Sequence, residues 1–176
     1  MRTLPDLLQP ARDLVFVGIN PGEQPACAAR HDFPHGNGFW SALTALPLVE
    51  CPLTPEDDRS LSLTDRIDLT DIVKQVIVGG DISTVGELRV LASAFRRCIA
   101  YDLPRAVCFT SIGAFNLLFP KIRARNGWGC QSVTIEGAQI WVMSSTSDRT
   151  MLHRDHVQRV LQELTAAIAI DRTVAA

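Results

Sequence analysis

A short, uninterrupted apolar run near the N-terminus is the feature that most constrains how this chain folds. Residues Leu14 to Ile19 read LVFVGI, with charged residues directly before them and Asn-Pro-Gly directly after them. A continuous apolar run of this length is typical of a buried strand, and Asn-Pro-Gly is typical of a turn. The sequence therefore predicts a buried strand that ends abruptly in a turn.

Predicted strands and helices alternate along the rest of the chain. The pattern predicts a second buried strand over 105–110 and paired strands at 133–135 and 139–143. It predicts helices over 39–46, 85–101, 112–119 and 151–170, and we expect the chain to fray after the last helix. Residues 67–78 are ambiguous and are either a loop or a short strand. This alternation predicts an α/β fold with a central, largely parallel sheet. No repeat or domain boundary is visible, so we expect a single domain over 1–176 with a core of about 14–170.

In parallel sheets, binding sites gather at the carboxyl ends of strands. The loops that follow Ile19 and Met143 both come directly after predicted strands. If those strands are parallel neighbours, the two loops face one cleft. We therefore expect the functional site in these two loops.

Composition bounds the function only loosely. The chain has 176 residues, 47% apolar and 20% charged, with a net charge of −2, so a nucleic-acid partner would have to be bound by a local basic patch. Its five cysteines are widely spaced and form no C-x-x-C pair, which favours reduced, mostly buried thiols over a zinc or iron–sulfur site. The sequence has no signal peptide and no apolar run of membrane-spanning length, so we expect a cytoplasmic protein with no membrane partner.

Three motifs carry the candidate chemistry. The first is Gly18-Ile19-Asn20-Pro21-Gly22, which is either a plain turn or a site where two glycines let a ligand approach the backbone while Asn20 points into the cleft. The second, Gly36-Asn37-Gly38-Phe39-Trp40, is either a helix start with two core aromatic residues or part of the same site. The third, Ser144-Ser145-Thr146-Ser147-Asp148-Arg149, is a capping loop with a solvated Arg149 or a phosphate-binding loop.

Together these motifs resemble one protein family. GINPG after the first strand, GNGFW downstream, NGWGCQSVTI followed by QIWVM, and the Ser-rich loop are similar to the mismatch-specific uracil and thymine-DNA glycosylases of the uracil-DNA glycosylase superfamily, over roughly residues 14–160. The resemblance implies a three-layer α/β/α fold and hydrolysis of the N-glycosidic bond of a flipped uracil, or of thymine or a modified pyrimidine. Its partner would be double-stranded DNA with a G·U or similar mismatch, in base excision repair. It implies no metal and no cofactor, and we expect a monomer of bacterial type that is associated with the nucleoid when it acts.

The resemblance also assigns roles by position. Asn20 matches the catalytic asparagine, whose amide can hold a water near C1′ of the sugar but is no strong base. The base pocket would comprise Gly18, Ile19, Pro21, Gly22, Phe33 and Asn37, and the DNA-binding residues would be Ser145, Thr146, Ser147 and Arg149. Arg149 falls where the family places the wedge that fills the space left by the flipped base. These motifs contain no lysine, so no Schiff-base step is expected.

The sequence departs from the family pattern at three places. Ungapped counting puts Asp32 where an aromatic residue stacks on the base, and a shift of one residue would put Phe33 there. In the family, a proline usually opens the loop after the last strand. That proline is missing here before Ser144, which leaves the rigidity of the loop open. Ser111-Ile112 stands where the family has Gly-Lys after the middle strand, so one basic residue is absent.

Other interpretations remain open from the residues alone. A non-catalytic nucleotide or nucleic-acid binding module on the same fold would fit the net charge, but it would have no need of Asn20. A hydrolase with a cysteine nucleophile is disfavoured, because no cysteine lies in a recognisable nucleophile turn. His31 and His35 are either loop residues facing solvent or part of the site. His153 and His156 share one helix face, for which we predict solvent exposure rather than metal binding.

Overall fold

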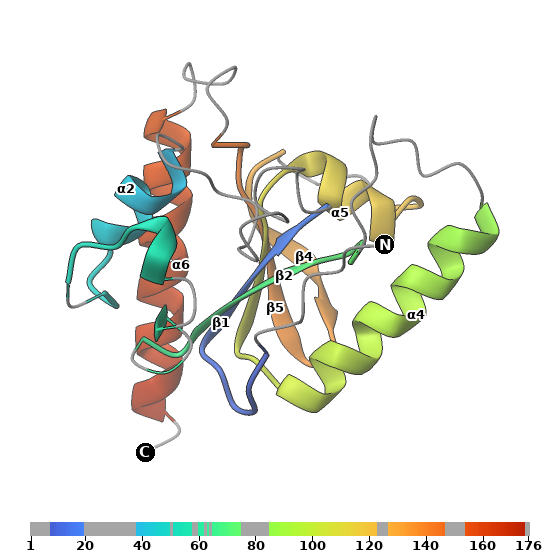
Figure 1. Cartoon of the computed structure of the whole chain (residues 1–176), viewed down its shortest axis with the longest axis horizontal. Coiled ribbons are helices and arrows are strands. Elements are labelled where there is room, and N and C mark those ends of the chain that lie inside the picture. The colour runs from blue at the N-terminus through green and yellow to red at the C-terminus, as the bar shows by residue number, and fades with distance from the viewer. Residues whose placement is uncertain are drawn as a thin grey trace.

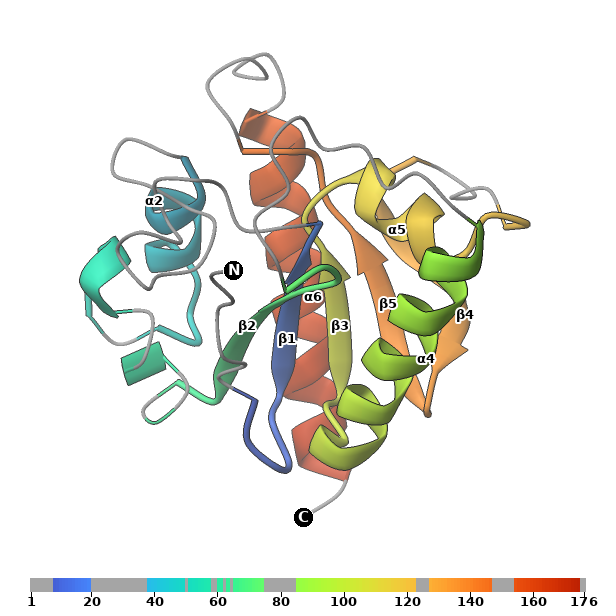
Figure 2. The same cartoon turned by 45° about the vertical axis from the view of Figure 1, so that its right-hand side comes forward.

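A central sheet organises the computed structural model. The structure describes residues 8–19, 38–49, 51–57, 60–61, 63, 65–74, 85–122, 127–146 and 154–174. In this part of the chain the sheet has five strands in the order β2-β1-β3-β5-β4, and Figure 2 shows them side by side. Their bounds are β1 Leu14–Gly18, β2 Ile67–Asp71, β3 Ala106–Phe109, β4 Gly129–Ile135 and β5 Ala138–Val142. The first four in spatial order are mutually parallel, and β4 pairs with β5 as an antiparallel edge strand.

Helices cover both faces of this sheet, which gives three layers. On one side stand α2 (Gly38–Thr44) and α6 (Arg154–Val174), and on the other stand α4 (Val85–Asp102) and α5 (Ile112–Leu118), as Figure 1 shows. A short 3-10 turn, η1, spans Pro55–Asp57. The expected three-layer α/β/α fold with a largely parallel sheet is therefore confirmed.

Alternation along each strand divides the buried apolar residues between the two faces. Phe16 of β1 points to the α2/α6 side, where its ring meets that of Phe39 edge to face at 5.1 Å between centroids. Val15 and Val17 point to the α4/α5 side, where Phe109 contacts the rings of Phe95, Phe115 and Phe119. Strands β1 and β3 are buried along their whole length, as a central parallel strand must be when helices cover both faces.

The element bounds differ from the sequence predictions at several places. Strand β4 begins at Gly129 rather than Val133, because its alternating exposure hides the edge strand from a search for continuous apolar runs. Helix α6 continues to Val174, beyond the predicted end at Ile170. Strand β3 lies between β1 and β5, so the strands before the two site loops are parallel but not neighbours.

The cysteines also differ from expectation. Of the four described, Cys108 is buried and Cys98 is partly buried, whereas Cys51 and Cys130 are exposed. The expectation of mostly buried thiols is therefore wrong for two of them. No disulfide joins any of these four.

The amino-terminal edge of the sheet holds a network of charges around two buried carboxylates, Asp13 and Asp68. Asp13 forms ion pairs with Arg66 at 2.8 Å and with Arg105 at 3.1 Å. Arg12 lies 3.8 Å from Asp68, which also accepts a hydrogen bond from the backbone N–H of Gln9. These ion pairs join the segment before β1 to β2 and to the start of β3.

Asp102, at the end of α4, belongs to the same network, but among the described residues its carboxylate forms none of the hydrogen bonds that Asp13 and Asp68 form. Its side chain is fully buried, and neither carboxylate oxygen has a hydrogen-bond partner in the described structure. Burial, and secondarily the charge of Asp68, raise the pKa of Asp102 from 3.8 to about 7, although Arg12 opposes the shift. Asp102 therefore titrates near neutrality in the folded protein.

Candidate active site at the carboxyl edge

The carboxyl edge of the sheet is held by hydrogen bonds that continue past the strand ends. The carbonyl of Gly18 accepts from the N–H of Ile72 at 3.1 Å, and that of Ile19 accepts from Val73 at 2.8 Å. On the other side of β1, the N–H of Thr110 donates to the carbonyl of Val17 at 3.0 Å. The chain is thus hydrogen-bonded on both sides as far as Val17, and on the β2 side as far as Ile19.

Gly18 lies against a carboxylate that the sequence analysis did not single out. Gly18 pairs in register with Asp71, the last residue of β2. A Cβ built on Gly18 would come closer than 3.0 Å to Oδ1 of Asp71 and within 3.4 Å of its Cγ. In the described structure the close approach at Gly18 is therefore made by Asp71. The approach of a ligand to the backbone of Gly18 and Gly22 stays a prediction.

Ile19, the second described residue of the predicted base pocket, packs toward α5. Its side chain belongs to the apolar cluster on the α4/α5 side, and its Cδ1 lies 3.5 Å from the Cβ position of Gly113. This packing anchors the end of β1 against α5.

The second and third motifs meet beside this edge. The Cβ position of Gly38, which opens α2, lies 3.7 Å from the backbone carbonyl oxygen of Thr146. Phe39 and Trp40 are buried in the α2/α6 core, so their role in the described structure is packing. Of the Ser-rich loop, Ser144 is buried, and Ser145 and Thr146 are partly exposed. The structure therefore brings the start of α2 and the loop after β5 together.

Several predicted site residues lie outside the described residues: Asn20, Pro21, Gly22, Phe33 with its alternative Asp32, Asn37, Ser147 and Arg149, together with His31 and His35. Their assigned roles remain predictions. The described residues establish the frame from which these segments extend.

Ser111 has a structural role where the family pattern has Gly-Lys. It is the N-cap of α5, and its hydroxyl accepts a hydrogen bond from the N–H of Ala114 at 3.1 Å. A serine in this position satisfies one of the unpaired donors of the first helical turn. The departure from the family pattern is thus compatible with a well-formed helix start.

His156 differs from the predicted exposed helix face. Its ring is partly buried against Trp128 of the NGWGC segment, with 4.7 Å between ring centroids, and its Nδ1 lies 3.0 Å from Arg159. His153 lies outside the described residues. Within the described ranges, no group of three or more His, Cys, Asp or Glu side chains could hold a metal ion.

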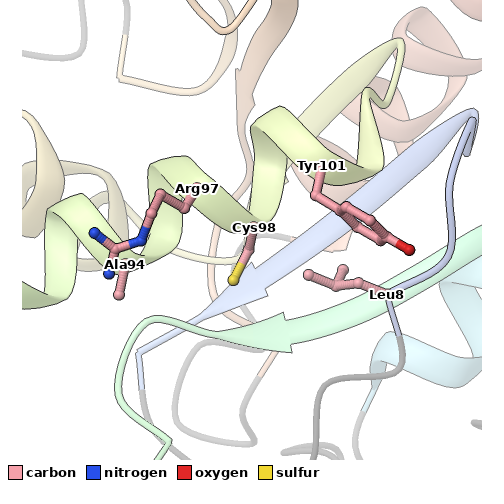
Figure 3. Close-up of a pocket in the computed structure, with 5 residues that line it drawn as sticks. All are labelled: Leu8, Ala94, Arg97, Cys98 and Tyr101. Carbon is pink, nitrogen blue, oxygen red and sulfur yellow. The ribbon is translucent and has the colours of Figure 1, made fainter.

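A pocket of about 420 Å³ lies elsewhere, between α4 and the segment before β1. Figure 3 shows Tyr101 and Cys98 of α4 facing Leu8, with Arg97 and Ala94 further along the helix. Because α4 ends at the amino edge of the sheet, this pocket belongs to the opposite end from the three motifs. It is not part of the candidate site.

An α/β/α sandwich with a largely parallel sheet is an architecture that binds ligands at the carboxyl edge of its strands. The family model of the uracil DNA glycosylase superfamily matches residues 5–165. The chain belongs to the uracil DNA glycosylase superfamily. Membership implies a DNA-binding hydrolase that cleaves N-glycosidic bonds in base excision repair. Among the described residues, no helix is both long and apolar enough to cross a membrane.

Proposed function

We propose that the protein is a monofunctional glycosylase of the mismatch type, which removes flipped uracil from G·U pairs in duplex DNA. The observation that carries the proposal is the GINPG motif at the carboxyl end of β1, where the carbonyls of Gly18 and Ile19, directly before Asn20 in the sequence, accept hydrogen bonds from the residues that follow β2. Superfamily membership supports the reaction, and the order of the three motifs supports the mismatch branch. Thymine and modified pyrimidines are further candidate substrates.

The proposed mechanism rests on positioning and charge stabilisation. Asn20 holds the attacking water near C1′ while the bond to the base breaks, and the base departs as an anion. Backbone N–H groups of the Gly18–Gly22 segment would stabilise that anion, with Phe33 stacking on the base and Asn37 lining the pocket. Ser145, Thr146 and Ser147 would bind the DNA backbone. No step in this scheme uses a metal or a cofactor.

Cleavage of defined duplexes tests this proposal. Under single-turnover conditions in the presence of chelator, we expect alkali-labile sites at uracil opposite guanine. Uracil opposite adenine should react more slowly, because a Watson–Crick pair is harder to open than a mismatch. If no duplex is cleaved, the proposed glycosylase activity is wrong, and a non-catalytic binding module on the same fold becomes the remaining interpretation. Equal rates on both duplexes would retain the glycosylase and overturn the mismatch type.

Arg149 provides a second test, because we propose that it enters the stack once the base has left. An arginine there can stack its planar guanidinium and bond to the orphaned partner base, whereas alanine can do neither. Arg149→Ala should weaken productive binding to G·U duplex by roughly 1–3 kcal/mol, the scale of one stacking or base-edge contact. Uracil in single-stranded DNA should be affected much less, since no space opens in a stack.

The measurement is single-turnover cleavage of both substrates by wild type and variant. Arg97→Ala is the matched control, because it removes an exposed arginine from α4, outside the three motifs. An equal loss on single and double strands would show that Arg149 contacts only phosphate.

A further inference from the structure

The pairing of Gly18 with Asp71 at the carboxyl edge calls for an explanation. Asp71 is only 3% exposed, and a buried carboxylate is expensive to desolvate. Its strand, β2, is buried along its whole length although it lies at the edge of the sheet. Its burial beside the last residue of β1 makes Asp71 a candidate for a functional role.

Strand geometry places this carboxylate on the side of the sheet where the motifs meet. Side chains two residues apart share a face, so Asp71 points the same way as Leu69, and Gly18 the same way as Phe16. Leu69 and Phe16 both pack in the cluster under α2 and α6. The carboxylate therefore lies over Gly18 on the side that also carries Gly38 and Thr146.

Space, rather than backbone conformation, accounts for a glycine at position 18. Among described glycines, those with positive φ are Gly127, Gly129 and Gly137, and Gly18 is not one of them. A Cβ at Gly18 would instead overlap Oδ1 of Asp71. Gly18 and Asp71 thus form one packing unit: the carboxylate of Asp71 occupies the space that a side chain at position 18 would need.

We propose that Asp71 is a positioning residue of the glycosylase site, which fixes the end of β1 through its contact with Gly18 and so sets where Asn20 stands. The contact acts together with the hydrogen bonds from Ile72 and Val73 to the carbonyls of Gly18 and Ile19. An alanine at position 71 would leave a void over Gly18, into which the chain relaxes. A displacement of about 1 Å in a catalytic group can lower a rate roughly 100-fold. This inference rests on the proposed function.

Four variants separate a positioning role from a structural one: Asp71→Ala, Asp71→Asn, Gly18→Ala and the double variant Gly18→Ala/Asp71→Ala. Asp71→Ala should lower the single-turnover rate on G·U duplex roughly 10- to 100-fold. Half-saturation should stay within about threefold, because ground-state contacts to DNA are unchanged. Asp71→Asn has the same shape and should retain a rate within about fivefold of wild type.

The double variant tests the packing unit directly. Gly18→Ala alone should impair cleavage because its Cβ displaces the carboxylate, but it should add little once Asp71 is already alanine. Glu163→Gln is the control, since it neutralises an exposed carboxylate on α6. Thermal unfolding of each variant checks that the protein is folded, and Asp71→Asn keeps the test valid if Asp71→Ala does not fold.

The outcomes are distinguishable from failure of the proposed function. A wild-type protein that cleaves no uracil overturns the proposed function. An active wild type with an Asp71→Ala variant within about threefold of its rate overturns only the role of Asp71. Additive losses in the double variant, or an Asp71→Asn variant as slow as Asp71→Ala, also overturn positioning through shape.

Discussion

Replacing Asn20 with alanine should abolish most cleavage of uracil-containing duplex while leaving duplex binding nearly intact. The amide acts on the attacking water, whose position matters in the transition state and not in the ground-state complex. Alanine cannot hold that water, so the single-turnover rate should fall by at least about 100-fold, the scale of losing one well-placed polar group. Duplex affinity should change by less than about threefold.

Single-turnover cleavage and equilibrium binding to the same G·U duplex provide the measurement. Asn116→Ala is the matched control, because Asn116 is an exposed asparagine on α5, outside the three motifs. A variant that cleaves at close to the wild-type rate would remove Asn20 from the mechanism. A variant that no longer binds would instead assign Asn20 to recognition.

The three-layer fold could be predicted because its signals are local. The continuous apolar run at Leu14 and the one at Ala106 have the pattern of strands covered on both faces, and that is how β1 and β3 lie. The edge strands were harder to predict from sequence. Strand β4 alternates in exposure, and β2 contains Asp68 and Asp71, whose charges conceal a fully buried strand.

The candidate site could be predicted only where a motif marks it. GINPG and GNGFW are contiguous in sequence, so their residues could be named in advance. Asp71 could not, because its significance comes from a pairing across the sheet with Gly18, 53 positions away along the chain. Asp71 lies within the segment 67–78, whose structure the sequence left ambiguous. Only the pairing register of β1 and β2 shows that Asp71 ends a strand and lies beside Gly18.

The buried network at the opposite edge makes a separate prediction about stability. The pKa of Asp102 is raised from 3.8 to about 7 by burial and by Asp68. Between these two values the folded protein binds more protons than the unfolded chain, so stability falls as pH rises. The stabilisation linked to this proton is complete below about pH 4 and is lost as the pH passes about 7. A shift of this size corresponds to at most about 4 kcal/mol.

Asp102→Asn should therefore stabilise the protein at pH 8 and have little effect at pH 4. An amide has the shape of the protonated acid, and burying it costs less than burying a carboxylate whose oxygens have no hydrogen-bond partner in the described structure. The gain at pH 8 should be on the order of a few kcal/mol. Arg12, Asp13, Asp68 and Arg105 are present in both proteins, so the difference between variant and wild type isolates Asp102.

Chemical denaturation of both proteins at several pH values between 4 and 8 measures this difference. Glu163→Gln on α6 is the control, because an exposed carboxylate should show no such dependence on pH. A stability difference that stays constant from pH 4 to pH 8 would mean that Asp102 does not change its protonation in this range. A destabilised variant at pH 8 would mean that its carboxylate is compensated by Arg12 more strongly than burial opposes it. With the predicted result, the charges at the amino edge would govern how stability varies with pH, while the carboxyl edge carries the proposed catalysis.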